Sequence, residues 1–194
     1  MIFKQCGKNM YVKISVKDLV LETERLILRP WRESDLADFY EYASVPGVGE
    51  MAGWPHHTSI EESKRILAHF LARENVFALV YKENNKVIGS LGFHPSWTDS
   101  LEAYKDLRIS EIGYVLSKDY WGRGLMAEAV RKVIAYFFEN DLVDAFTVGH
   151  YSFNNQSRRV IEKCGFQYVK TENYTSEQTG KTYESLKYIL HRKR

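Results

Sequence analysis

The sequence predicts a mixed α/β fold, a central and mostly antiparallel sheet flanked by helices, and two observations carry this prediction. The first is an apolar stretch at 108–117, followed by a glycine-containing turn, an amphipathic helix and a further strand at 145–151, which is the order of a βαβ unit. The second is a hairpin-like pair of strands on either side of that unit, FALVYKENNKVIGSLGF before it and FQYVKT with TYESLKYIL after it. Such hairpins make the sheet antiparallel outside its centre.

The N-terminal part of the chain predicts one strand and two helices. RLILRPW at 25–31 alternates as a strand does, and apolar residues then recur at helical spacing over 36–43, with Ser34 as the expected cap. A second helix begins in TSIEESKRILAHFLARE, where Ser59 and Glu62 have the spacing of a capping box. The intervening segment, SVPGVGEMAGWPHH, is rich in turn formers and predicts a loop.

Turn and cap residues delimit the remaining elements. The first hairpin is expected to reverse at 83–86, Glu-Asn-Asn-Lys, because asparagine tolerates the positive φ of a tight turn. Asn154 or Asn155 is expected to cap a short helix in NNQSRRVIEKCGF, and Gly165 to end it. The last hairpin is expected to turn near 179–180. The helix that follows the glycine-containing turn is expected to bury Met126, Val130, Val133 and Phe137.

Length and composition predict one domain. With 194 residues, 44% of them hydrophobic, the chain can bury one substantial core, and no Pro/Gly/Ser-rich linker divides it. We expect an N-terminal extension at 1–20, a single domain at 21–190, and a solvated basic tail at 191–194.

Charge and cysteine usage exclude several classes of protein. The 27 Lys and Arg against 25 Asp and Glu are too balanced for the basic field of a nucleic-acid binder, so no direct nucleic-acid partner is expected. The longest apolar run, at 133–138, is far shorter than the ~20 residues of a membrane helix, and the N-terminus lacks a secretory signal. Cys6 and Cys164 form no metal-binding pattern, and a cytoplasmic, reduced environment is expected.

The turn DYWGRGLMAEA at 119–129 is the strongest candidate for a binding site. Gly122 and Gly124 stand where a strand gives way to a helix, and the unpaired N–H groups and the dipole of a helix N-terminus attract anions such as phosphate. A P-loop is excluded because no Gly-Lys-Ser/Thr follows the glycines. The turn therefore predicts a phosphate site of another kind.

A dinucleotide-binding turn is the closest rival interpretation. Gly122, Gly124 and Ala127 match its G-x-G-x-x-G/A pattern, and Asp144 lies at about the expected distance of ~20 residues beyond. However, Asp144 precedes the strand 145–151, whereas the acid of that fold follows its strand and meets the ribose there. This mismatch disfavours a nicotinamide-dependent oxidoreductase.

Four segments in order resemble a known family. LETERLILRPWRESD, KVIGSLGF, EIGYVLSKDYWGRGLMAEAV and FNNQSRRVIEKCGF are similar to the GNAT superfamily of acyl-CoA-dependent N-acyltransferases, nearest its RimJ/RimL branch, over about residues 20–190. The resemblance implies the GNAT fold with two splayed central strands, acetyl-CoA (coenzyme A) as cofactor, and transfer of an acetyl group to an amine.

The resemblance also implies which residues hold the cofactor. The family pattern Gln/Arg-x-x-Gly-x-Gly/Ala, whose main-chain amides cradle the pyrophosphate, keeps Gly124 but has Trp121 at its first place and Met126 at its last. Arg159, with Arg158 beside it, could meet the 3′-phosphate or simply form an exposed helix face. The implied cofactor-binding residues are Tyr114, Val115, Leu116, Trp121, Gly122, Arg123, Gly124, Leu125, Met126, Asn154, Ser157 and Arg159.

Acyl transfer to an amine needs a base, an oxyanion donor and an acid for the departing thiolate, but no covalent enzyme nucleophile. Glu111, on the strand beside the implied cofactor site, is the expected base, and His150 is the alternative. Ser157 is the expected thiolate donor, with Tyr151 in reserve, and a main-chain N–H near Val115 would meet the oxyanion.

The acceptor amine stays open at this point. Glu50, Trp54 and His57, in the loop between the first two helices, fall where the family admits its acceptor, although a turn-rich surface loop explains them equally well. RimJ/RimL relatives acetylate N-terminal α-amines of ribosomal proteins, whereas other members take small amines or polyamines. A non-catalytic acyl-CoA sensor is a further alternative, and a homodimer is left open.

Overall fold

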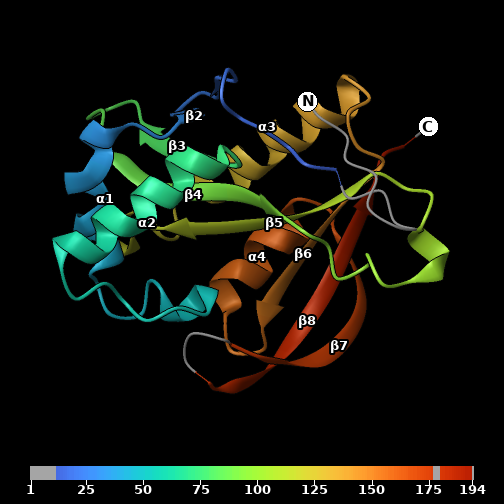
Figure 1. The fold of residues 1–194 in the computed structure, drawn as a ribbon. Helices are drawn as coiled ribbons and strands as arrows, with labels where there is room; N and C mark the ends of the chain where they lie inside the picture. The colour runs from blue at the N-terminus through green and yellow to red at the C-terminus, as the bar shows by residue number, and fades with distance from the viewer. Residues whose placement is uncertain (1–11, 177–179, 194) are drawn as a thin grey trace.

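The computed structural model describes residues 12–176 and 180–193, and in this part of the chain one sheet of eight strands carries the fold (Figure 1). The strands are β1 (Leu21–Glu22), β2 (Leu26–Pro30), β3 (Val76–Tyr81), β4 (Val87–His94), β5 (Ile109–Leu116), β6 (Ala145–Tyr151), β7 (Gln167–Thr175) and β8 (Thr182–His191). The helices are α1 (Leu36–Ala43), α2 (Ile60–Arg73), α3 (Leu125–Glu139) and α4 (Asn155–Lys163).

The order of the strands is β1-β2-β3-β4-β5-β6-β8-β7, and each neighbouring pair is antiparallel except β5 and β6. The parallel pair is the βαβ unit, with α3 as its crossover, because parallel strands need a long connection. This arrangement confirms the predicted mixed and mostly antiparallel sheet.

Two hydrophobic clusters lie on the two faces of the sheet. The larger contains α3 and part of α4 and is centred on Phe93, Phe137 and Phe146, whose ring centroids lie 5.2–6.1 Å apart. The smaller lies under α1 and α2, which stand side by side in Figure 1, and contains Trp31 and Phe39. The residues predicted to be buried in α3 are buried, namely Met126, Val130, Val133 and Phe137.

The predicted caps and turns are mostly confirmed. The Ser59 hydroxyl accepts the Glu62 N–H at 3.2 Å at the start of α2, and Asn85 has φ 58° in the first hairpin turn. Asn154 caps α4, and Gly165, with φ 83°, follows its end. Thr179, in the predicted last turn, lies outside the described residues.

The cap predicted for α1 is wrong. Ser34 does not cap it; a 3-10 turn at Glu33–Asp35 precedes the helix, and the Asp35 carboxylate accepts the Arg32 N–H at 2.8 Å. Asp35 also forms a bidentate ion pair with Arg29, at 2.7 Å for both bonds. A buried carboxylate with a cationic partner stabilises this end more strongly than a neutral hydroxyl would.

The two ends of the chain are more closely integrated than expected. Val12, Ile14 and Val16 fall within the predicted N-terminal extension, yet each is at most 2% exposed in the larger cluster. Arg192, in the predicted solvated tail, donates its N–H to Asp144 O at 2.9 Å and pairs with the Asp141 carboxylate at 2.7 Å. Of these segments, the described residues named here pack against the domain.

Candidate active site

The central strands separate halfway along their length. The pairing of β5 with β6 covers only Ile109–Glu111 and Ala145–Thr147. Beyond these residues the strands bound a cavity of about 490 Å³, which we call the central cavity. The splayed strands implied by the family resemblance are therefore present, and among the predicted cofactor and catalytic residues only Arg123 does not line this cavity.

The glycine-containing turn closes one end of the central cavity. Gly122 and Gly124 have φ 75° and 78°, a conformation that favours glycine, and α3 begins at Leu125 with no side chain capping its first turn. The first N–H groups of the helix are thus left for another partner. A Cβ on Gly122 would meet nothing within 4 Å, so the space in front of the turn is open. These features fit a pyrophosphate group.

Side chains around the turn hold it in place. Trp121 donates its indole N–H to Leu116 O at 2.8 Å, and Arg25 donates to Arg123 O at 3.0 Å and to the Glu128 carboxylate at 2.8 Å. The Arg123 guanidinium points away from the cavity, where it donates to the Tyr81 hydroxyl at 2.6 Å. The Arg123 side chain is therefore engaged elsewhere, and any contact of Arg123 with a ligand in the turn is left to its main chain, as the resemblance implies.

The start of α4 forms the opposite wall of the central cavity. Asn154 accepts the Ser157 N–H at 3.0 Å and donates to Met51 O at 3.0 Å, so its amide joins the helix cap to the loop before α2. The Ser157 hydroxyl lies 2.9 Å from the Tyr114 hydroxyl across the gap. These two hydroxyls form a polar pair in a largely apolar cavity.

The two arginines of α4 have different surroundings. Arg159 lines the central cavity, whereas Arg158 donates to the Glu162 carboxylate at 2.8 Å one turn along the helix. The structure thus favours Arg159 over Arg158 as the one available to an anion.

Glu111 lies at the point where the strands separate. Its carboxylate accepts the Trp97 N–H at 3.4 Å, and burial raises its pKa while the nearby Lys187 opposes that rise. Lys187 is only 8% exposed and lines the same cavity. Its ammonium lies 3.7 Å from Glu172. A buried carboxylate with a raised pKa suits proton transfer better than a fully solvated one.

His150 is poorly arranged to accept a proton. Its Nδ1 lies 2.8 Å from Tyr151 O, and because a carbonyl can only accept, Nδ1 carries the hydrogen. Its Nε2 lies 3.2 Å from the Tyr188 hydroxyl, which occupies the remaining lone pair. Both nitrogens are engaged, so the structure disfavours the alternative base.

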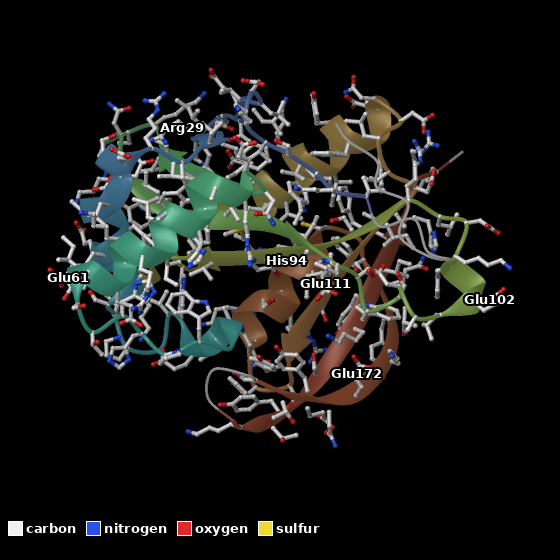
Figure 2. The ribbon with its side chains drawn as sticks, in the orientation of Figure 1. Arg29, Glu61, His94, Glu102, Glu111 and Glu172 are labelled. Carbon is white, nitrogen blue, oxygen red and sulfur yellow. The ribbon has the colours of Figure 1, made fainter. Side chains whose placement is uncertain are left out.

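His94 is a candidate that the sequence analysis missed. It pairs in register with Glu111 across β4 and β5, and the two side chains lie close together near the centre of Figure 2. Its ring lies over Gly113, where an added Cβ would stand 2.9 Å from Nε2. Desolvation, reinforced by the positive charge of Arg73, lowers its pKa and so favours the neutral ring, although part of the side chain is exposed. Only the strand register reveals this neighbour of Glu111.

The main chain of β5 supplies donors to the central cavity. Ser117 donates its N–H to Ile88 O of β4, and in an antiparallel ladder every second residue bonds to the same neighbour. The N–H groups of Tyr114 and Leu116 therefore point to the opposite side, toward the gap, and that of Val115 points to β4. The oxyanion donor expected near Val115 is therefore the N–H group of Tyr114 or of Leu116.

A second cavity of about 440 Å³, which we call the lateral cavity, lies between α1, α2 and the sheet. Trp54 and His57 line it, as expected for acceptor-binding residues. His57 is buried, which lowers its pKa, and its Nδ1 lies 2.7 Å from the Ser63 hydroxyl. The lateral cavity meets the central cavity at residues that line both, Ala52, His94, Gly113, Tyr114 and Val115.

Glu50 lines neither cavity, so the prediction that it binds the acceptor is not supported by its position. Its carboxylate accepts the Gly47 N–H at 2.7 Å and lies 2.8 Å from the His56 Nδ1. Burial by itself would raise the pKa of Glu50, but these hydrogen bonds lower that pKa to about 2. Glu50 holds the loop in shape.

A family comparison decides what this arrangement is. The model of the acetyltransferase (GNAT) domain matches residues 25–167. The chain belongs to the GNAT acetyltransferase family. Membership confirms the predicted fold, the predicted enzyme class, an N-acetyltransferase, and acetyl-CoA as its cosubstrate.

Individual relatives agree with this assignment. The chain is 27% identical over 176 residues to the uncharacterized N-acetyltransferase YoaA of Bacillus subtilis, covering 88% of this chain and 96% of that protein. A GNAT acetyltransferase from Bacillus anthracis shares the fold with a TM-score of 0.77 at 18% identity, over 91% of this chain and 100% of that one. RimL, a ribosomal L7/L12 α-N-protein acetyltransferase solved with coenzyme A, gives 0.71 at 17% identity, over 89% and 97%.

Two other kinds of feature are absent from the described residues. No helix among them is both long and apolar enough to cross a membrane. No three His, Cys, Asp or Glu side chains in residues 12–176 and 180–193 gather in a way that could hold a metal ion.

Proposed function

We propose that this acetyltransferase transfers an acetyl group from acetyl-CoA directly to a primary amine, with His94 as the base. The observation that supports the proposal most strongly is the continuity of the central cavity. It runs from the glycine-containing turn, through the gap between β5 and β6, to His94 and Glu111. The cosubstrate supplies an activated thioester at the end of this path.

The amine must lose a proton as it is acetylated. His94 accepts it in this proposal, because its lowered pKa favours the neutral ring and its side chain lines both cavities. Glu111, the predicted base, stays the alternative, since its raised pKa also suits a proton acceptor. The Tyr114 or Leu116 N–H meets the developing oxyanion.

The departing thiolate must gain a proton. Ser157 stays the proposed donor, and its contact with the Tyr114 hydroxyl at 2.9 Å gives it a group that can replenish the proton. Burial raises the pKa of Tyr114 and so keeps this hydroxyl protonated. Tyr151, the reserve donor, lines the same cavity.

The family branch, the acceptor amine, the cellular location and the oligomeric state are more specific proposals. An N-terminal α-amine, with a pKa of about 8, demands less of a base than a lysine side chain at about 10.4. RimL supports the predicted RimJ/RimL likeness only through the shared fold. A ribosomal-protein N-terminus, a cytoplasmic location and a homodimer all stay predictions.

The first experiment separates binding from chemistry. Calorimetry with acetyl-CoA, CoA and NADP should give heat with the two CoA species only. His94→Gln should lower kcat by about 10²-fold and remove the acidic limb of the pH–rate profile, because that limb reports protonation of the base. Glu111→Gln should lower kcat less and keep the limb.

Matched controls make the outcome decisive. His191→Gln and Glu139→Gln change exposed residues that line neither cavity and should leave kcat unchanged. Loss of the acidic limb in Glu111→Gln alone would move the base to Glu111. Tight acetyl-CoA binding, with no amine acetylated by any form of the protein, would favour the non-catalytic sensor.

A further inference from the structure

The walls of the lateral cavity are aromatic and compact. Phe39, Tyr42, Trp54 and Phe70 line it, and the Phe39 ring centroid lies 5.5 Å from that of Tyr42 and 5.5 Å from that of Phe70. Its volume of about 440 Å³ lies within the range of small-molecule sites. The walls therefore fit an apolar body of modest size.

Its floor is formed by two glycines that pair across β4 and β5. Gly92 pairs with Gly113, and both face the lateral cavity. A Cβ on Gly92 would stand 3.0 Å from the Val76 side chain, and one on Gly113 would stand 2.9 Å from His94 Nε2. The hollow thus depends on the absence of side chains at this pair, and a molecule in it comes directly beside His94.

The lateral cavity offers little to a second positive charge. Glu62 is the one carboxylate among its lining residues, all of which lie in the described part of the chain. Its carboxylate already accepts the Thr58 N–H at 2.9 Å. The charged or basic groups of the lining besides Glu62 are Arg73, His57, His69 and His94. A second ammonium group, as in a polyamine or a lysine, would have Glu62 as its one carboxylate partner there and would also meet the positive charge of Arg73, which makes the site unfavourable for it.

Two buried polar atoms lie behind the walls of the lateral cavity. The Tyr42 side chain is 3% exposed, and its hydroxyl lies beside Ser90 without a hydrogen bond of proper geometry. Asn75 donates its amide to Phe93 O at 2.7 Å, which leaves its Oδ1 unpaired. Neither atom has accessible surface, so neither offers a hydrogen bond to a molecule in the cavity. The wall that a ligand meets there is correspondingly apolar.

We propose that the acceptor is a small primary monoamine with an aromatic or branched apolar body, bound in the lateral cavity. This inference rests on the proposed function. The apolar body packs against the aromatic wall, and the amine nitrogen lies beside His94. The N–C bond to the acetyl group forms as the C–S bond breaks; His94 takes the amine proton, and Ser157 protonates the thiolate.

Rates with four acceptors test the class. Phenethylamine, spermidine, lysine and a hexapeptide with a free N-terminus are compared at equal acetyl-CoA by following CoA release. The value of kcat/KM for phenethylamine should exceed that of each other acceptor by about 10-fold or more, since burial of a ring contributes and a second ammonium detracts. A preference for spermidine, lysine or the peptide would overturn this inference and leave the proposed function standing.

Two variants locate the site. Phe70→Leu should raise the KM for phenethylamine about 5-fold with kcat nearly unchanged, because one ring of the aromatic wall is lost. The matched control, Phe153→Leu, removes an exposed ring that lines neither cavity and should change neither constant. Ile66→Glu adds a carboxylate to the wall and should shift preference toward spermidine. An unchanged KM in Phe70→Leu would place the acceptor elsewhere.

Direct binding separates the two possible failures. N-Acetylphenethylamine titrated into the unaltered protein should give a saturable heat. Saturable binding of phenethylamine without CoA release would support the lateral cavity and overturn the proposed transfer. Absence of binding, together with turnover of another amine, would overturn only the inference.

Discussion

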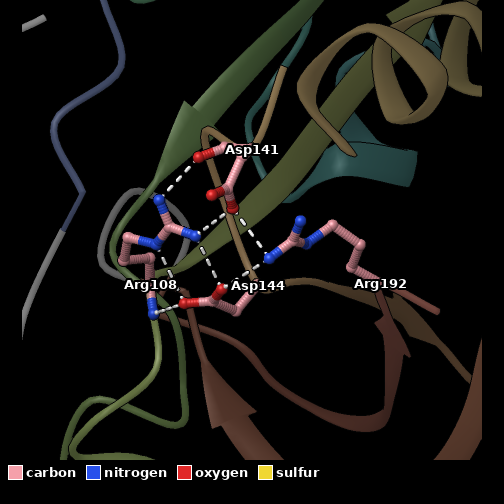
Figure 3. Close-up of polar contacts among 4 residues, drawn as sticks. All are labelled: Arg108, Asp141, Asp144 and Arg192. Carbon is pink, nitrogen blue, oxygen red and sulfur yellow. Dashed lines mark hydrogen bonds and ion pairs between the residues drawn. The ribbon is translucent and has the colours of Figure 1, made fainter. Parts of the chain in front are cut away.

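The two ends of the β5–β6 pair contrast sharply. At the amino ends of these strands, Arg108 donates to the Asp144 carboxylate at 2.7 and 3.0 Å and to Asp141, and Arg192 joins both aspartates (Figure 3). At the carboxyl ends, the strands diverge around the central cavity, and Ser157 lines the gap. Ion pairs hold the strands together at their amino ends, whereas the strands are separated at their carboxyl ends.

The difference teaches how the protein maintains an open gap between neighbouring strands. Backbone groups that leave a ladder without a partner are costly, so a gap needs support elsewhere. The ion-pair network fixes the strands at their amino ends, and Asn154 ties α4 to the loop before α2 at the other end. The gap is therefore formed before a ligand enters, and little ordering is needed on binding.

The largest effect is expected at the open end. Gly122→Asp puts a carboxylate where a pyrophosphate fits, and repulsion should weaken acetyl-CoA binding by about 100-fold or more in calorimetry. Aspartate tolerates a positive φ better than most residues, so the fold should survive.

Gly180→Asp is the matched control for this variant. Gly180 also has a positive φ, 65°, and nothing lies within 4 Å of an added Cβ, but it lines neither cavity. It should bind acetyl-CoA normally. Equal affinities for the two variants would refute the assignment of the turn.

A moderate effect is expected at the closed end. Asp144→Asn should lower the free energy of unfolding by about 1–2 kcal/mol in denaturant titrations, because the charge-assisted bonds to half-buried Arg108 are lost. The control is Asp106→Asn, which changes an exposed carboxylate close to Arg108 in sequence and should leave the free energy of unfolding unchanged. An undiminished stability of Asp144→Asn would show that the network does not hold the strands.

The same aspartate predicts a pH dependence. Hydrogen bonds with Arg108 lower the pKa of Asp144 to about 2, below its ordinary value of 3.8. A depressed carboxyl pKa stabilises the fold above the ordinary value, and this contribution disappears as the pH falls from about 4 to about 2. Over that range the unaltered protein should lose stability more steeply than Asp144→Asn. Parallel curves would contradict this role.

The smallest effect is expected at the rim of the open end. Arg159→Ala should weaken CoA binding about 3- to 5-fold, as an exposed ion pair contributes at most about 1 kcal/mol. Dephospho-CoA should be bound equally well by both forms if Arg159 meets the 3′-phosphate. Arg158→Ala, which removes only the pair with Glu162, is the control and should leave both affinities unchanged.

The sequence alone determined what depends on neighbours along the chain. The glycine-containing turn, the caps by Ser59 and Asn154, and the positive φ of Asn85 follow from local backbone chemistry, and the structure confirms them. The placement of Asp144 before β6 likewise disfavoured the dinucleotide interpretation, and in the structure this residue pairs with Arg108 instead. Local rules suffice where the interacting groups are close in sequence.

Only the tertiary structure decided which side chains meet across the sheet. His94 lies beside Glu111 because β4 and β5 pair in one particular register. A shift of that register by one residue would turn the His94 side chain to the other face of the sheet, and no local sequence signal fixes the register. The same holds for His150, whose lone pair is taken by Tyr188 on the neighbouring strand β8. The sequence pointed to the candidate cofactor turn because its donors are consecutive, whereas the proposed base and the proposed acceptor space depend on strands and helices brought together from distant parts of the chain.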